Sequence, residues 1–253
     1  MASANIQDAL DPVRAHRALR SVLDLSPDLV GLQEWSPARF PILARTGRLG
    51  LVPHLGVQLP RSAAEATPTY LWNTPILGGC AVGARTDRFE LVRCRTRFLS
   101  RPGLADREPH RRTLEPGRAA TVAVYRDLLV DRTVCLVNYH LVSGVQTSGR
   151  YRWDRPRLTA RHRQEVQVLQ ALVREQLALG HVVHATGDSN FDGLRIPGLT
   201  STWEGRELHA GTLGPRRKVD DVHGPGPGEA VTLVTTASDH RAVVVRRLVE
   251  VGP

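Results

Sequence analysis

Residues 185–193, ATGDSNFDG, follow the apolar run HVVH at 181–184, which is typical of a buried strand. Gly187 allows a sharp turn where that strand is expected to stop. Asp188 and Asn190 are two residues apart, so an extended backbone points both side chains to the same side. The carboxyl end of a strand is where enzymes built on sheets hold reactive groups. The same residue types also form ordinary turns, so the rest of the chain has to distinguish the two readings.

The chain has 253 residues and is 41% hydrophobic, which is enough for a substantial core. We expect one domain over residues 1–253, because no linker or internal repeat interrupts the sequence. No segment has the ~20 apolar residues of a membrane span, and residues 1–10 lack the basic and apolar regions of a signal peptide. The cysteines Cys80, Cys94 and Cys135 show no metal-ligand spacing and are expected to be buried thiols. We therefore predict a cytoplasmic protein that does not enter a membrane.

The net charge of +9 indicates a polyanionic partner such as nucleic acid. Arginine supplies nearly all of this charge, since Lys218 is the only lysine. Such a skew is also typical of a GC-rich genome. The charge therefore supports a nucleic-acid partner without establishing one.

The order of predicted elements indicates the fold class. Asp11 and Pro12 form a helix start as N-cap and first helical residue, and a long helix is expected at 161–179, before Gly180. Residues 40–59 fit either type of element, and 61–69 are expected to be a polar loop. This order favours a layered α/β sandwich with antiparallel hairpins over a regularly alternating sheet. Strands are expected at 3–7, 29–32, 78–84, 89–93, 119–125, 133–138, 181–184, 199–203, 231–235 and 242–248.

Two segments are rich in arginine. Residues 101–118 are expected to form a long exposed loop, and residues 142–159 a second basic segment. Arginines interleaved with aromatic residues suit phosphate contacts combined with base stacking. A solvated loop whose aromatic side chains pack locally is the alternative. The candidate substrate-binding residues are Arg150, Tyr151, Arg152 and Trp153.

Polar side chains recur where predicted strands end. Each has an ordinary structural explanation by itself: Asn5 fits a turn, Glu34 fits an ion pair, and His140 fits a hydrogen-bonded core histidine. Their joint occurrence beside buried strands is harder to explain in this way, because a buried charge is costly unless it is paired, solvated or bound to metal. The strand-end positions are Asn5, Gln33-Glu34, Asn138-Tyr139-His140, Asp188-Ser189-Asn190 and Asp239-His240, with Asp220 as a further candidate.

These pieces resemble the endonuclease/exonuclease/phosphatase superfamily, the deoxyribonuclease-I-like fold. The resemblance covers essentially the whole chain, and its segments follow the family's order. It implies a four-layer α/β sandwich with two packed mixed sheets flanked by helices, and a metal-dependent phosphoesterase site at one end of the sheets. The matching segments are SANIQ at 3–7, DLVGLQEW at 28–35, GGCAVGAR at 78–85, LVNYHL at 136–141, ATGDSNFDG at 185–193, KVDDV at 218–222 and SDHRAVVV at 238–245.

The resemblance implies a divalent cation, Mg²⁺ or Mn²⁺. Glu34 would hold it, with Asn5 close by, and Asp239 would assist the metal or its waters. Carboxylate and amide oxygens without cysteine suit these cations better than a closed zinc site.

The resemblance also implies a set of catalytic groups. His140 would contact the scissile phosphate or protonate a leaving oxygen, and Asp188 would handle the attacking water or the leaving-group proton. Asn190 would orient the phosphate or the nucleophile. His240 would be a second catalytic histidine, with Asp220 as its carboxylate partner. No residue is expected to be a covalent nucleophile, so we expect direct attack by water.

The chain departs from the family pattern at three places. Tyr139 stands where the family more often has Thr or Ser, and Ser189 stands where an aromatic residue is frequent. Asp221 follows Asp220, so either acid could be the histidine partner. None of these departures removes a catalytic group.

We predict hydrolysis of nucleic-acid phosphodiester bonds, with DNA favoured over RNA, by a monomer. The first alternative is a phosphatase or phosphodiesterase for a small or lipid-linked phosphate such as an inositol phosphate. The second is a catalytically silent nucleic-acid-binding relative. The shared core does not choose among these, because function depends on the loops.

Overall fold

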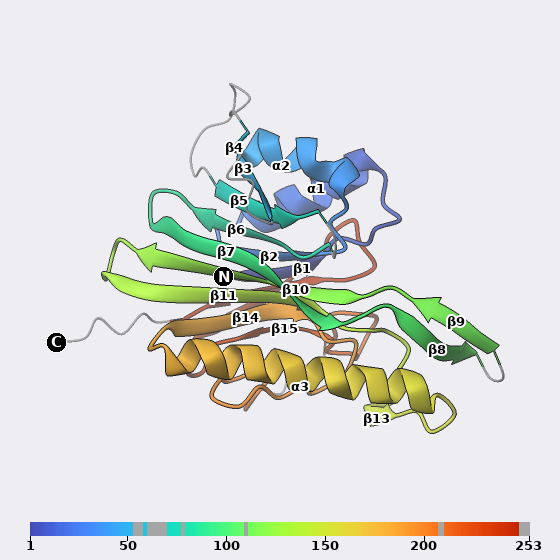
Figure 1. The fold of residues 1–253 in the computed structure, drawn as a ribbon. Helices are drawn as coiled ribbons and strands as arrows, with labels where there is room; N and C mark the ends of the chain where they lie inside the picture. Colours follow the sequence, from blue (N-terminus) through green and yellow to red (C-terminus); the bar gives the residue numbers. More distant parts are fainter. Residues whose placement is uncertain (53–57, 60–69, 77–78, 109–110, 207–209, 248–253) are drawn as a thin grey trace.

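The computed structural model describes residues 1–52, 58–59, 70–76, 79–108, 111–206 and 210–247. These form a four-layer sandwich, in which two sheets face each other and helices cover their outer faces (Figure 1). The predicted fold class is therefore confirmed. The predicted polar loop at 61–69 lies outside the described residues.

The larger sheet has eight strands and mixes parallel with antiparallel pairs. Helix α1 (Pro12–Leu23) and helix α2 (Phe40–Thr46) cover its outer face, and a short 3₁₀ helix (Pro37–Arg39) precedes α2. In spatial order the strands are β16 (Ala230–Val234), β17 (Ala242–Arg246), β1 (Ala2–Asn5), β2 (Leu29–Gln33), β6 (Ala81–Arg85), β5 (Tyr70–Pro75), β3 (Gly47–Val52) and β4 (Gln58–Leu59).

The smaller sheet has five strands, and the long helix α3 (Pro156–Ala178) packs on its outer face. Two short hairpins stand apart from both sheets. They are formed by β8 (Gly103–Glu108) with β9 (Arg111–Glu115), and by β12 (Gln146–Thr147) with β13 (Arg150–Tyr151). In spatial order the five strands are β15 (Asp220–His223), β14 (Val182–Asp188), β11 (Arg132–His140), β10 (Arg118–Asp127) and β7 (Phe89–Ser100).

Apolar clusters hold the layers together. Two lie between the sheets: one joins Leu29 and Val82 to Tyr125 and Leu136, and the other joins Val222 to Val243. Two more lie under the helices, one beneath α1 and α2 and one beneath α3. Asp11 caps α1 by accepting a hydrogen bond from the amide of Arg14, as its position before Pro12 predicts. The cysteines Cys80, Cys94 and Cys135 are free and buried, as expected. Within the described part of the chain, no helix is long and apolar enough to cross a membrane.

Two predicted elements are wrong. Residues 101–118 are not a long loop, because β8 and β9 pair across their centre. Residues 199–203 are not a strand. Thr200 makes one isolated bridge to Gly224, and Thr202 then hydrogen-bonds to Asp221 through its backbone amide. In the hairpin, the many arginines hide the alternation of apolar and polar residues that would predict a strand. In 199–203, short polar side chains hydrogen-bond to the backbone and so compete with the hydrogen bonds of a sheet.

The strand at 181–184 also continues further than predicted. Gly187 is not a turn residue, because it lies inside β14 and pairs with Tyr139 of β11. A Cβ atom at Gly187 would lie 2.4 Å from the backbone oxygen of Tyr139 and 2.6 Å from its ring. The glycine is therefore required by the close approach of β11, which leaves no room for a side chain.

A Gly187→Ala variant is therefore expected to lower the free energy of unfolding by about 1–3 kcal/mol, the usual cost of overpacking a closed site. Urea unfolding followed by circular dichroism measures this change. Gly103→Ala is the matched control, because among the described residues its added Cβ would meet just the end of the Arg161 side chain, at an ordinary contact distance of 3.7 Å. Equal unfolding midpoints for the two variants would contradict this explanation of Gly187.

Candidate active site

Two parallel strand pairs place their carboxyl ends at the same end of the sandwich. β1 runs parallel to β2 with Asn5 opposite Gln33, and Glu34 follows directly. β11 runs parallel to β14 with His140 opposite Asp188. Because the two sheets face each other, the last residues of these strands meet. The polar residues that the sequence places at strand ends thus form one cluster.

Asn5 connects the two sheets. Its Nδ2 atom donates hydrogen bonds to Glu34 Oε1 at 3.1 Å and to Asp188 Oδ2 at 3.0 Å. The other Glu34 oxygen accepts a hydrogen bond of 2.7 Å from the amide of Asp8. Glu34 itself has a left-handed backbone with φ of 58°. One amide nitrogen thus holds two carboxylates from opposite sheets close together.

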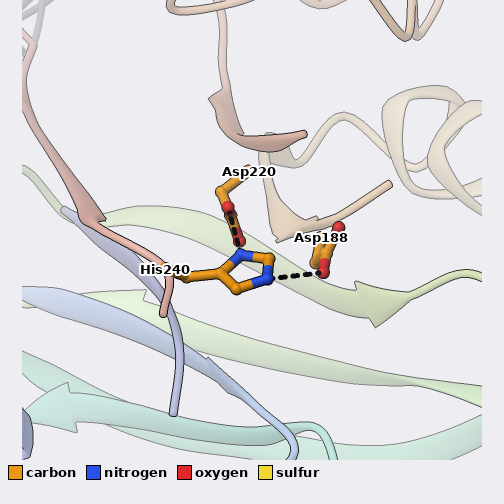
Figure 2. Close-up of side chains that lie close together, drawn as sticks. All are labelled: Asp188, Asp220 and His240. Carbon is orange, nitrogen blue, oxygen red and sulfur yellow. Dashed lines mark hydrogen bonds and ion pairs between the residues drawn. The ribbon is translucent and has the colours of Figure 1, made fainter. Parts of the chain in front are cut away.

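His240 lies in the loop before β17 and contacts two acids. Its Nδ1 atom is 2.7 Å from Asp220 Oδ2, and its Nε2 atom is 4.0 Å from Asp188 Oδ2 (Figure 2). Asp221 points elsewhere, since its carboxylate accepts hydrogen bonds from the Ser201 hydroxyl at 2.5 Å and from a backbone amide. Asp220, and not Asp221, is therefore the partner of His240, because the antiparallel register sets Asp220 opposite Asp188.

His140 faces the cluster with one ring nitrogen. Nε2 is 3.7 Å from Asp188 Oδ2 and 3.9 Å from Glu34 Oε1. Nδ1 is 3.5 Å from the Arg118 guanidinium. Since a guanidinium can only donate, Nδ1 accepts and the proton of the neutral ring lies on Nε2. Burial, Arg118 and His240 together hold the pKa of His140 well below its usual value, so His140 is a neutral hydrogen-bond donor.

The pKa values of Asp188 and His240 are raised, in contrast to that of His140. Burial and then the charge of Asp220 raise the pKa of Asp188 to about 7. Burial alone would lower the pKa of His240, but its hydrogen bond and ion pair with Asp220 outweigh burial and raise the pKa to about 9. At neutral pH the site thus holds one protonated imidazole, one neutral imidazole and a carboxyl group close to its titration midpoint.

One acid of the site, Asp220, has a carboxylate oxygen without a protein partner in the described part of the chain. Asp220 Oδ1 is buried and has no hydrogen-bond partner among the described residues. Ligand atoms of Asp188, Asp220 and His240 lie within 4.8 Å of one another, and Glu34 and Asp188 meet at one amide nitrogen. The carboxylates of Glu34, Asp188 and Asp220 are the oxygen ligands that a hard divalent cation takes, so these acids fit such an ion, whereas His240 carries a proton and is not a ligand.

The predicted metal residues do not all come together. Asn5 and Glu34 meet as described. Asp239 is exposed, and its carboxylate accepts a hydrogen bond from the Ser238 hydroxyl at 3.2 Å. Asp239 still contributes to the positive shift of the His240 pKa through its charge. Its role toward a metal or its waters stays a prediction.

Asn190 is close to the site for a reason other than the one expected. It lies beyond the end of β14 with a left-handed φ of 53°, so the same-side argument from extended backbone is wrong. Its backbone amide donates to Asp188 Oδ1 at 2.7 Å, and its Nδ2 atom donates to the Leu141 carbonyl at 3.0 Å. In this structure Asn190 orients the carboxylate of Asp188, and its predicted contact with phosphate stays a prediction.

The four predicted substrate-binding residues differ in accessibility. Trp153 is 91% exposed, and Arg150 is also exposed. Tyr151 packs on Phe191 with ring centroids 4.4 Å apart and contacts His162 through its hydroxyl, so its ring faces are occupied by the protein. Arg152 is paired with Asp154. Trp153 and Arg150 are the most exposed of the four, and contact of all four with a substrate stays a prediction.

One residue of the site was missed in the sequence, and another was singled out at a strand end without a role. Arg118 begins β10 and contacts His140, but in sequence it looks like one more exposed arginine. Asn138 is fully buried and joins the sheets, since it donates to the backbone carbonyls of Leu32 and Ala81 and accepts from Gln33 at 2.6 Å. A polar residue in the middle of an apolar strand is the signal that could have identified Asn138.

Comparison with known proteins gives structural matches only. No family model and no curated protein matches the sequence. A crystal structure of D. rerio TDP2 complexed with single strand DNA product matches with a TM-score of 0.63 and 16% identity, covering 96% of each chain. An endonuclease/exonuclease/phosphatase family protein from Bacteroides thetaiotaomicron matches with a TM-score of 0.62 and 15% identity, covering 96% of this chain and 92% of the other.

A third match is a mannosyl-6-phosphatase from Bacteroides thetaiotaomicron, with a TM-score of 0.61 and 13% identity over 97% of each chain. At such low identity these matches establish the shared fold. They span proteins that differ in their named substrates, so the fold does not select one of them.

Proposed function

We propose that this chain, which has the deoxyribonuclease-I-like fold of endonuclease/exonuclease/phosphatase structures, is a divalent-metal-dependent hydrolase of phosphoric esters. One observation carries the proposal: buried Asp188 lies within 4.0 Å of a ring nitrogen of both His140 and His240 and accepts a hydrogen bond from Asn5. A carboxylate flanked by one cationic and one neutral imidazole is suited to proton transfer beside an anionic phosphate.

Each group has a role that follows from its protonation state. His240 is a cation whose Nδ1–H is fixed by Asp220, so its Nε2–H can bind and neutralise a phosphate oxygen. His140 donates from Nε2 to a second oxygen of the phosphate. Asp188 takes a proton from the attacking water, because a pKa raised towards 7 makes it more basic than an ordinary carboxylate. As the new P–O bond forms, the bond to the leaving oxygen breaks, and this oxygen takes the proton of His240 Nε2. Asn190 keeps Asp188 in position.

The cation would be held on the Glu34 side of the site. Glu34 and Asp188 supply carboxylate oxygens there, and Asn5 keeps them together. A bound Mg²⁺ or Mn²⁺ would reduce the negative charge of the phosphate and lower the pKa of bound water. The choice of these ions over zinc follows from the oxygen-rich donors and the lack of a cysteine in this cluster.

The substrate we propose is a nucleic-acid phosphodiester, with DNA favoured. Support comes from the net charge of +9 and from the exposed residues Arg150 and Trp153 close in sequence to the site segments. The D. rerio TDP2 structure contains a single strand DNA product, which fits this choice. A small phosphate monoester is the second candidate, and the match to a mannosyl-6-phosphatase favours it.

The purified protein is expected to shorten end-labelled single-stranded DNA when Mg²⁺ or Mn²⁺ is present and to stop when EDTA is added, because the metal offsets the charge of the phosphate. Gel electrophoresis measures the products, and release of phosphate from mannose 6-phosphate and an inositol phosphate is measured in parallel. Intact DNA and RNA together with released phosphate would favour the second candidate. Retarded but uncleaved oligonucleotide would indicate a binding protein.

A further inference from the structure

The hairpin of β8 and β9 projects from the end of the sandwich that carries the site (Figure 1). We propose that this hairpin is a substrate arm, and that Leu104 and Leu114 on its outer face contact unpaired bases of the nucleic-acid strand next to the scissile phosphate. This inference rests on the proposed function and adds to it the requirement that the substrate be a strand several nucleotides long.

The hairpin is fixed to the body of the protein on the side that faces α3. Asp106 accepts hydrogen bonds from the first free amides of α3, at Arg157 (3.1 Å) and Leu158 (2.9 Å). Arg107 forms a two-pronged ion pair with the buried Glu115. The arm is therefore held in a defined position, which lowers the conformational cost of binding.

An apolar core secures the same face. Ala105 is buried in a cluster with Val142, Val145 and Leu158, which belong to the loop after β11 and to α3. Arg107 also reaches the hydroxyl of Ser143 at 3.2 Å. The hairpin is thus packed on the segment that directly follows His140 in the chain.

The outer face is apolar and exposed. Leu104 and Leu114 are directly opposite each other across the two strands and are 57% and 71% exposed. Single exposed leucines are common on protein surfaces, but a cross-strand pair forms one contiguous patch on a projecting element. Such a patch, on an arm fixed at its other face, is suited to contact with a ligand.

The charges around the patch select the ligand. The described acids of the hairpin are engaged: Asp106 caps α3, Glu115 pairs with Arg107, and Glu108 pairs with Arg111 at 3.5 Å. Arg101 and Arg112 are exposed and have no acidic partner in the part of the chain that the structure describes. Aliphatic side chains beside unpaired arginines match a ligand with flat bases and a phosphate backbone.

The distance to the site is short. Leu114 precedes Arg118 by four residues, which spans at most about 14 Å of extended chain, and the Arg118 side chain covers the remaining path to His140. At about 3.4 Å per nucleotide along a stacked strand, the backbone part of this path alone corresponds to about four nucleotides. A strand whose scissile phosphate lies at His140 can therefore reach the leucine pair.

The test compares two double variants of the full chain. Leu104→Ser with Leu114→Ser removes the patch, and Leu128→Ser with Leu129→Ser is the matched control at the turn between β10 and β11, where these leucines are 52% and 72% exposed. Fluorescence anisotropy of labelled oligothymidylate measures the dissociation constant. Steady-state hydrolysis of that oligonucleotide and of the small diester bis(p-nitrophenyl) phosphate gives KM and kcat for each substrate. We expect the first variant to weaken oligonucleotide binding and raise its KM about tenfold, as for loss of one stacking contact, with kcat for the small diester unchanged.

Several results would contradict the proposal that the hairpin is a substrate arm. They are equal oligonucleotide binding by the wild type and both variants, an equal loss on the small diester, or a change of oligomeric state in gel filtration that identifies the patch as a protein contact. The anisotropy keeps this test separate from the proposed function. If the protein binds the oligonucleotide through the leucine pair but does not cleave it, the hairpin is a substrate arm and the proposed nuclease activity is wrong. If the protein cleaves the oligonucleotide and the leucine variant binds it as tightly as the wild type, the nuclease activity is supported and the substrate arm is wrong.

Discussion

Replacing Asp188 with asparagine is expected to reduce kcat for the phosphoric ester at least about a thousandfold, within the range for loss of a general base. Asparagine keeps the shape of the side chain and can still accept the hydrogen bond from the Asn190 amide, which is 2.7 Å from Oδ1. It cannot accept a proton from water. Steady-state kinetics at saturating substrate and metal measure the change.

Loss of folding can be separated from loss of chemistry in this variant. Burial and the charge of Asp220 raise the pKa of Asp188 to about 7, so removal of its charge favours the folded protein. The new NH2 group cannot accept the hydrogen bond that Asn5 Nδ2 donates to Oδ2, which opposes this gain, and the unfolding temperature is expected to change little. Asp131→Asn is the control, because Asp131 is exposed and pairs with the exposed Arg126. A kcat for Asp188→Asn within tenfold of the wild-type value would refute the assigned role.

The second large effect concerns the cation. Glu34→Gln is expected to raise the Mg²⁺ concentration for half-maximal activity at least about tenfold, since a ligand charge is lost while the side chain keeps its size and an acceptor for Asn5. Binding of Mn²⁺ followed by calorimetry should weaken in parallel, which gives a readout independent of turnover.

Glu175→Gln is the matched control for this prediction. Glu175 lies on α3 and pairs with Arg95 at 2.7 Å, far from the strand ends that form the site. Its variant should keep the wild-type metal dependence. Unchanged Mg²⁺ dependence and unchanged Mn²⁺ affinity in Glu34→Gln would show that Glu34 does not hold the ion.

Much of the fold is predictable from local signals. Asp11 and Pro12 mark the start of α1, and the apolar run at 29–32 corresponds to β2. The position of the site is predictable because polar residues follow several predicted strands, and the carboxyl ends of parallel strands lie at the same edge of a sheet. Asn5, Glu34, His140 and Asp188 meet because β1 with β2 and β11 with β14 run parallel. His240 joins them because β17 is antiparallel to β1, so the start of β17 lies beside the end of β1. Their catalytic roles stay predictions until the variants are measured.

Other features depend on contacts between distant segments. Helix α3 begins at Pro156, five residues before the predicted start, because Asp106 of the β8–β9 hairpin caps it from outside the helix. The choice between Asp220 and Asp221 depends on the register of β15 against β14. Gly187 looks like a turn residue until the close approach of Tyr139 is known. No local pattern contains this information.

The central claim is that a divalent cation and the residues around Asp188 direct water onto the phosphorus of an ester. Hydrolysis of single-stranded DNA in water labelled with heavy oxygen, with Mg²⁺ and with excess EDTA, tests it most directly. The account predicts that labelled oxygen appears in the phosphate group of the product and that EDTA abolishes product formation. Equal rates with EDTA, unlabelled phosphate in the product, or no hydrolysis of DNA, RNA or any small phosphoric ester by the folded protein would contradict it.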